Sequence, residues 1–114
     1  MEGKLTYRLA MAQMRVEWGD AAGNLARAAE LIAKGAAQGC SVVVLPECLD
    51  IGWTHPEAAE LARPIPGEYS YVLAEAARWH DVWVVAGLTE RAGDLVYNAA
   101  VIMSPDGEIV LKHR

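Results

Sequence analysis

The sequence GCSVVVLPE, residues 39–47, decides the fold. Its centre, Ser41–Leu45, is β-branched and apolar on both faces, which is typical of a strand covered on both sides. Gly39 stands where a preceding helix would end in a left-handed residue, and Pro46 ends the strand. A helix, a buried strand and a carboxylate directly after that strand predict an α/β fold with a crevice near Glu47.

The segments on either side extend this pattern in the order β-α-β-α-α-β-β-β. We expect further strands at Tyr7–Met14, Val82–Ala86, Leu95–Met103 and Glu108–His113. We expect helices at Asn24–Gln38, Pro56–Ala62 and Glu68–His80, with Asp20 or Asn24 capping the first. Tight turns are expected at Ala92–Asp94 and Ser104–Gly107, so the fold begins with crossovers and ends in hairpins.

The two faces of the sheet should differ in what covers them. Each long helix has one apolar face, whereas Val42–Leu45 and Val82–Ala86 are apolar on both. The helices therefore cover one face, and a missing segment or a partner covers the other. We find no linker or repeat, so residues 1–114 form a single domain or part of one.

Composition restricts the class of protein. The chain has 114 residues, of which 54% are apolar, and a net charge of −5, which indicates a globular protein rather than a nucleic-acid binder. We expect no membrane association and no secretory leader, because no apolar stretch is long enough. Cys40 and Cys48 form no C-x-x-C pair and are expected to be free thiols, which favours a cytoplasmic location.

Glu47 is the most informative candidate for a catalytic residue. It follows a buried strand at the edge where open α/β sheets bind ligands, and there we expect its carboxylate to be partly desolvated. A carboxylate so placed suits a general base. On position alone, a turn residue that caps nearby amides is the favoured interpretation, and spacing by itself does not make Glu47 catalytic.

Several blocks, taken in order, resemble the N-terminal part of the nitrilase superfamily of carbon–nitrogen hydrolases. They lie at residues 7–14, 24–28, 39–47, 84–91, 97–101 and 104–109. The resemblance implies the N-terminal portion of a four-layer α-β-β-α sandwich and a Glu-Lys-Cys catalytic set. In that set a cysteine attacks an amide or nitrile carbon, and a glutamate takes the thiol proton and later activates water. A lysine stabilises the tetrahedral intermediate. It implies no cofactor and no metal.

Only the glutamate of that set carries over directly, onto Glu47 as general base. Lys112-His113-Arg114 resembles the residues that lead into the family's Arg-Lys pair, so the catalytic lysine would come next. Lys112 matches it only in a shifted register and otherwise is a solvated strand-end lysine. We therefore expect residues 1–114 to be a partial domain, truncated before the catalytic lysine and cysteine.

The two cysteines match no nucleophile of the family. Cys48 is next to Glu47, but neighbours on an extended backbone point to opposite sides, so we expect Cys48 to point away. Cys40 lies before the strand, near the end of the helix, and both are expected to be small buried residues.

The loop after Glu47 is a candidate wall of the substrate pocket. Trp53 either lines that pocket or closes the sheet edge. His55 is interpreted as a residue leading into a helix, and Tyr97 and Asn98 as residues that fix the sheet. The histidines show no metal-ligand spacing.

These observations favour hydrolysis of a small amide, carbamoyl compound or nitrile by the parent protein, with amidase or carbamoylase activity preferred. The 114 residues alone are expected to be inactive, and the full-length form to be a homo-oligomer. The alternatives are a non-catalytic truncated paralogue or interaction module, and an unrelated α/β binding domain.

Overall fold

The computed structural model describes residues 3–114 and has the expected order of elements. Its strands are β1 (Leu9–Met11), β2 (Val42–Val44), β3 (Trp83–Ala92), β4 (Leu95–Met103) and β5 (Ile109–His113). Its helices are α1 (Ala21–Ala37), α2 (Ala58–Leu61) and α3 (Glu68–His80). The predicted α/β class and element order are confirmed.

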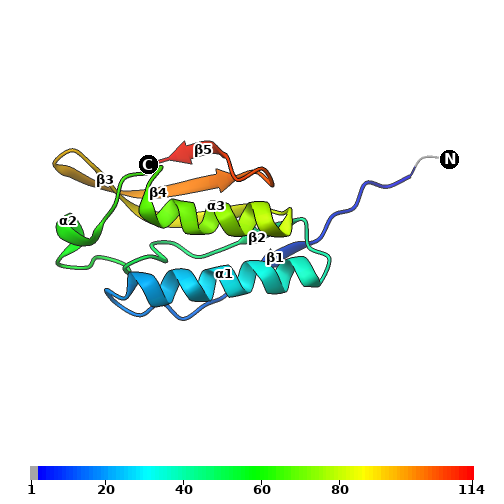
Figure 1. The fold of residues 1–114 in the computed structure, drawn as a ribbon, viewed down its shortest axis with the longest axis horizontal. Coiled ribbons are helices and arrows are strands. Elements are labelled where there is room, and N and C mark those ends of the chain that lie inside the picture. Colours follow the sequence, from blue (N-terminus) through cyan, green and yellow to red (C-terminus); the bar gives the residue numbers. More distant parts are fainter. Residues whose placement is uncertain (1–2) are drawn as a thin grey trace.

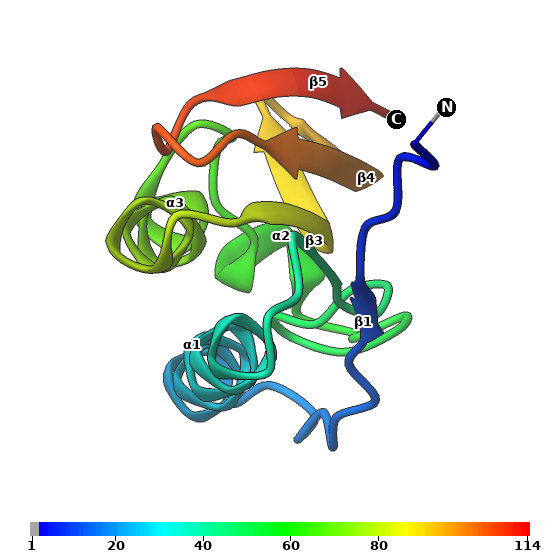
Figure 2. The same ribbon diagram turned by 90° about the vertical axis from the view of Figure 1, so that its right-hand side faces the viewer.

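All five strands form one sheet in the order β1-β2-β3-β4-β5 (Figure 1). The pairs β1–β2 and β2–β3 are parallel, whereas β3–β4 and β4–β5 are antiparallel. α1 and α3 lie on the same side of the sheet (Figure 2). The expected change from crossovers to hairpins is therefore present, and the Ser104–Gly107 turn is closed by a hydrogen bond from Gly107 N to Ser104 O, at 2.9 Å.

Helix α1 begins three residues earlier than expected. The Asp20 carboxylate caps it by accepting from the backbone N–H of Gly23, at 3.1 Å. Asn24 is instead fully buried inside the helix, where its amide donates to the carbonyl oxygens of Glu17 and Asp50. Gly39 follows the helix with φ of +80°, so the left-handed C-terminal residue is confirmed.

Strand register separates a covered face from an open one. Val43, Val84 and Met103 are directly paired neighbours on β2, β3 and β4, and all three are fully buried against the helices. The next row runs across all five strands as Met11, Val44, Val85, Ile102 and Leu111. Met11 in this row is 81% exposed and Leu111 is 50% exposed, so the second face carries no helix of residues 3–114.

The expected end of the third strand at Ala86 was wrong, because β3 continues to Ala92. Gly87, the residue directly after the expected strand end, lies buried inside the strand. A β-carbon on Gly87 would lie 2.5 Å from the Cα of Glu47 and 2.9 Å from the carbonyl oxygen of Pro46. Glycine is needed here because another stretch of backbone passes directly over the strand.

β1 and α2 are also shorter than expected, with three and four residues.

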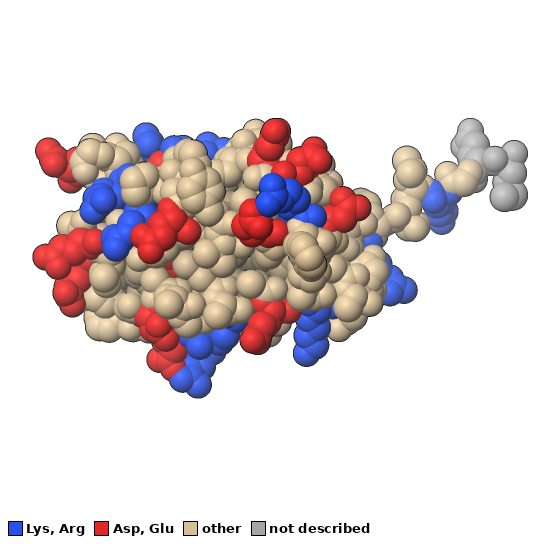
Figure 3. Space-filling model, in the orientation of Figure 1, with Lys and Arg blue, Asp and Glu red and all other residues tan. Residues whose placement is uncertain are grey.

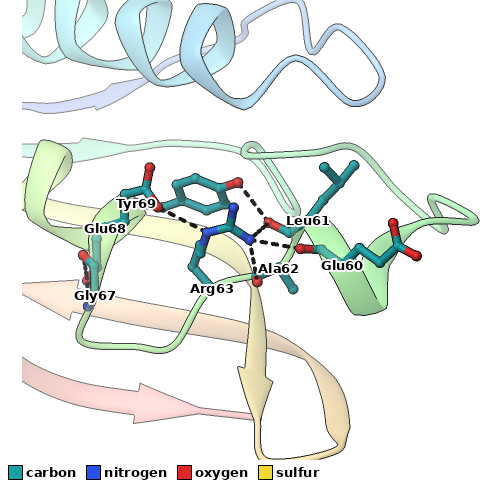
Figure 4. Close-up of polar contacts among 8 residues, drawn as sticks. Glu60, Leu61, Ala62, Arg63, Gly67, Glu68 and Tyr69 are labelled. Atoms are coloured by element: carbon teal, nitrogen blue, oxygen red, sulfur yellow. Dashed lines mark hydrogen bonds and ion pairs between the residues drawn. The ribbon is translucent and has the colours of Figure 1, made fainter.

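The connection from α2 to α3 is held by Arg63 (Figure 4). Its guanidinium donates to the carbonyl oxygens of Glu60, Leu61 and Ala62 at 2.9–3.1 Å, and to the Glu68 carboxylate at 3.0 Å. The carbonyl oxygen of Arg63 in turn accepts from the backbone N–H of Arg91 on β3, at 3.0 Å.

Acidic and basic side chains are interspersed over the face that carries α1 and α3 (Figure 3). In the described part of the chain, no helix has the length and apolar character needed to cross a membrane.

Candidate functional site

The turn that carries Glu47 is bound to β3 by its backbone. Leu45 N donates to Val85 O at 2.8 Å, Gly87 N donates to Pro46 O at 3.1 Å, and Leu49 N donates to Gly87 O at 3.0 Å. These bonds extend the pairing of β2 with β3 beyond the end of β2. Glu47 is thus fixed at the carboxyl end of a parallel strand, as the sequence predicted.

Glu47 lines a cavity of about 450 Å³ on the open side of the sheet. Gly87, Asn98, His113 and Arg114 line it as well, from β3, β4 and the end of β5. Glu47 is exposed in this structure, so the expectation of a partly desolvated carboxylate was wrong for residues 3–114. Solvent reaches Glu47 because the open face has nothing packed on it.

Asn98 contacts the Glu47 carboxylate directly. Its Nδ2 donates to Glu47 Oε1 at 2.5 Å, and its Oδ1 accepts from the Sγ of Cys48 at 3.7 Å. Asn98, interpreted from the sequence as a residue that fixes the sheet, thus also contacts the candidate base. The signal that could have identified it is register, because Asn98 pairs with Thr89, two residues beyond the glycine over which Glu47 passes.

The expectation that Cys48 points away from Glu47 was also wrong. It assumed an extended backbone, whereas Cys48 has φ of +46°, and its side chain reaches the same amide as Glu47. Cys48 is buried, and burial raises the pKa of its thiol. The neighbouring Thr89 hydroxyl acts to lower this pKa, and the nearby carboxylates of Asp50 and Glu47 raise it further. A protonated thiol donates hydrogen bonds but is a weak nucleophile.

Asp50 is a fully buried residue that the sequence interpretation did not single out. Its carboxylate accepts from the backbone N–H groups of Ile51 and Thr89, both at 2.8 Å, and from the Thr89 hydroxyl at 3.1 Å. Burial raises the pKa of Asp50, and the bonds from Thr89 and Ile51 partly offset that rise. Asp50 therefore anchors the loop after Glu47 to β3.

Trp53 lies beside the Glu47 cavity. Its side chain is 60% exposed and lines a smaller hollow of about 210 Å³, together with Cys48 and Asn98. Asn98 also lines the Glu47 cavity, so the two hollows are neighbours. The Nδ1 atom of His55 accepts from the backbone N–H of Glu57 at 3.0 Å, which agrees with a residue leading into a helix.

Lys112 is held on the helix side of the sheet. Its Nζ donates to Glu90 Oε2 at 2.5 Å and to Ile65 O at 3.3 Å, while Arg114 Nε donates to Glu90 Oε1 at 2.7 Å. Burial acts to raise the pKa of Glu90, but the bonds from Arg114 and Lys112 together hold that pKa below its usual value. His113, between these two cations, lines the Glu47 cavity, as Arg114 also does.

Residues 3–114 contain no group of three His, Cys, Asp or Glu side chains placed to hold a metal ion. Both cysteines are free: Cys48 is buried and Cys40 is half-buried.

A model of the carbon–nitrogen hydrolase family matches residues 8–114, almost the whole chain. The chain belongs to this family. Among curated proteins, it is similar to omega-amidase NIT2 of Danio rerio, with 38% identity over 95% of the chain and 39% of that protein. It is also similar to a nitrilase of Pyrococcus abyssi, with 39% identity over 90% of the chain and 40% of that protein.

Solved structures of the family confirm the fold. The NitFhit protein of C. elegans superposes with a TM-score of 0.81 at 27% identity, over 94% of the chain and 27% of that protein. Nit3 of Saccharomyces cerevisiae, a member of the nitrilase superfamily, gives 0.82 at 26% identity, over 93% of the chain and 42% of that protein. This carbon–nitrogen hydrolase chain spans about two fifths of the length of the curated relatives it matches.

Proposed function

We propose that the full-length protein hydrolyses a non-peptide carbon–nitrogen bond in a small amide or carbamoyl compound, with Glu47 as general base. The observation that carries this proposal is the position of Glu47. Its carboxylate lies at the end of β2, oriented by Asn98, in a cavity of about 450 Å³. A cavity of this size suits a small molecule. The similarity to an omega-amidase and a nitrilase supports the same class of substrate.

In the proposed reaction, Glu47 takes the proton of a cysteine thiol while the sulfur attacks the amide carbon. A lysine stabilises the oxyanion, and the proton passes to the leaving amine, so the carbon–nitrogen bond breaks and a thioester remains. Glu47 then takes a proton from water, which attacks the thioester and releases the acid and the thiol. We propose that the lysine and the cysteine follow Arg114 in the full-length protein.

Hydrolysis of a panel of primary amides, carbamoyl compounds and one nitrile by the full-length protein tests this function. Glu47→Gln keeps the shape of the side chain but removes the base, and is expected to lower kcat by about 10²–10⁴-fold. Glu57→Gln is the matched control, because Glu57 is exposed on the loop before α2 and should leave kcat unchanged. Ammonia release that is unaffected by Glu47→Gln would exclude Glu47 as the base.

Residues 1–114 alone are proposed to be inactive. The Cys48 thiol is buried, and its raised pKa keeps it protonated. Thiol-dependent turnover by the 114-residue chain, abolished by Glu47→Gln, would contradict this and identify Cys48 or Cys40 as a nucleophile.

The apolar row on the open face favours a second candidate function, an interaction module without catalysis. Its outer members Met11 and Leu111 are exposed, and Val44, Val85 and Ile102 between them are half-buried. An apolar face of this kind is normally covered. Sedimentation of the 114-residue chain distinguishes the candidates: an interaction module would form a defined oligomer through this face.

We further propose that the full-length protein is a cytoplasmic homo-oligomer that acts on small molecules.

A further inference from the structure

We propose that Cys48 and Asn98 are positioning residues, and that the Cys48 thiol, acting through the Asn98 amide, holds the Glu47 carboxylate in its productive orientation. This inference rests on the proposed role of Glu47 as the base. It concerns a residue pair that the sequence interpretation had assigned to packing.

The proposal starts from a chain of two hydrogen bonds through one side-chain amide. Asn98 Nδ2 donates to Glu47 Oε1 at 2.5 Å, and Asn98 Oδ1 accepts from Cys48 Sγ at 3.7 Å. A carboxylate only accepts, and a protonated thiol donates, so a single orientation of the amide satisfies both neighbours. The amide is therefore held at both ends, although Asn98 is exposed on β4.

Without the thiol, the Asn98 side chain would have one anchor and open solvent around it. Asn98 lies on the open face of the sheet, as Ala100 and Ile102 do, and no helix of residues 3–114 covers it there. An exposed side chain with one hydrogen bond samples other rotamers readily. Cys48 supplies the second contact from a position that is itself rigid.

Cys48 is rigid because its backbone is constrained on both sides. Its carbonyl oxygen accepts from Gly52 N at 2.9 Å, and the Glu47 Cα before it lies against Gly87. The left-handed φ of +46° at Cys48 is uncommon for a residue with a β-carbon, and it turns Sγ toward Asn98. Burial, which raises the pKa of the thiol, keeps Cys48 in the protonated form that can donate.

The consequence for catalysis is geometric. Asn98 occupies one oxygen of the Glu47 carboxylate and leaves Oε2 free to take a proton. A general base must approach the proton it takes to hydrogen-bond distance, and a small misplacement lowers the rate. Loss of the thiol contact should thus lower kcat without weakening substrate binding.

The test compares Cys48→Ala, Cys48→Ser and Asn98→Leu in the full-length protein, with Cys40→Ala as control. Cys48→Ala is expected to lower kcat about five- to tenfold at unchanged KM, and Cys48→Ser, which keeps a donor, to restore most of it. Asn98→Leu should lower kcat about ten- to a hundredfold. Cys40→Ala should have no effect. An unchanged kcat for Cys48→Ala, or a loss that Cys48→Ser does not restore, would overturn the proposal.

A second measurement is independent of activity. In the 114-residue chain, one side-chain N–H proton of Asn98 should resonate downfield because it donates to the charged Glu47 carboxylate, and should lose much of that shift in Glu47→Gln. Cys48→Ala is expected to reduce the shift and Cys48→Ser to retain it. If the shift responds in this way but no amide is hydrolysed, the proposed function fails while the positioning contact stands. A shift insensitive to Cys48→Ala overturns the inference.

Discussion

Replacing Gly87 by alanine tests the link between the fold and the candidate site most directly. Gly87 lies inside β3, and the Pro46-Glu47 turn crosses directly over it. The substitution adds one methyl group and alters no charge, no donor and no acceptor. Its effect should therefore arise from steric displacement of the turn that carries Glu47.

The magnitude follows from three contacts. The added carbon would lie 2.5 Å from Glu47 Cα, 2.9 Å from Pro46 O and 3.0 Å from Cys48 N. Because carbon atoms pack at about 3.5–4.0 Å, the turn must move by roughly 1 Å. Overpacking of this kind costs about 1–3 kcal/mol of unfolding free energy. A shift of about 1 Å at a catalytic group lowers the rate by about 10²-fold.

Two assays and one control separate the two effects. Urea unfolding followed by tryptophan fluorescence gives the stability of the 114-residue chain, and amide hydrolysis by the full-length protein gives kcat. Gly93→Ala is the control: Gly93 is in the β3–β4 turn with φ of +61°, and an added carbon would meet nothing within 4 Å. Gly93→Ala should lower the free energy of unfolding by about 1 kcal/mol through backbone strain and leave kcat unchanged.

Equal kcat values for Gly87→Ala and wild type, measured at a temperature where both are folded, would refute the reasoning. That result would mean either that the turn can move without displacing the Glu47 carboxylate, or that Glu47 is not the base. A kcat loss of similar size in Gly93→Ala would attribute the effect to general destabilisation.

Three further predictions concern stability and surface. Glu90→Gln removes the ion pairs with Lys112 and Arg114 and should cost about 1–2 kcal/mol at pH 7. Because the folded-state pKa of Glu90 is lowered, this contribution is present above the usual carboxyl pKa and is lost as the pH falls toward the lowered folded-state pKa. The difference in urea unfolding between the two proteins should therefore shrink on acidification below the usual carboxyl pKa. Asp50→Asn replaces one carboxylate oxygen by an NH2 group, which would face the N–H and O–H groups of Thr89 that now donate to Asp50. Thermal unfolding should show a loss of about 2 kcal/mol in the free energy of unfolding. Val85→Lys, on the open face, should keep the circular dichroism of the 114-residue chain and reduce its binding of a hydrophobic dye. Val84→Lys, one residue earlier and fully buried, should unfold it.

Hydrophobic patterning was sufficient for the architecture. Val42–Val44 and the two long helices were predicted because their periodicities are local and strong, and the open face followed from strands that are apolar on both sides. The length of β3 was mispredicted at Gly87. A glycine that ends a strand and a glycine that lets another backbone approach look identical in sequence, and only the tertiary contact with Glu47 distinguishes them.

The candidate site was predicted only in part, for a similar reason. Glu47 was identified from its position after a buried strand together with the family resemblance. Asn98 and Cys48 were interpreted as structural residues, because the contact between them joins positions fifty residues apart. The left-handed backbone at Cys48 has no local signal, since it results from the crossing at Gly87 and the bond from Gly52.

The order of strands in the sheet, which is also their order in the chain, has a consequence for biosynthesis. Each strand from β2 to β5 pairs with the strand that precedes it in the chain, which has already been synthesised. Pairing can therefore proceed from the N-terminus as the polypeptide leaves the ribosome. β5 is added last, and it brings His113 to the cavity that Glu47 lines. The cavity is thus completed last, and a nascent chain that stalls before β5 would leave β4, which carries Asn98, as the exposed edge of the sheet.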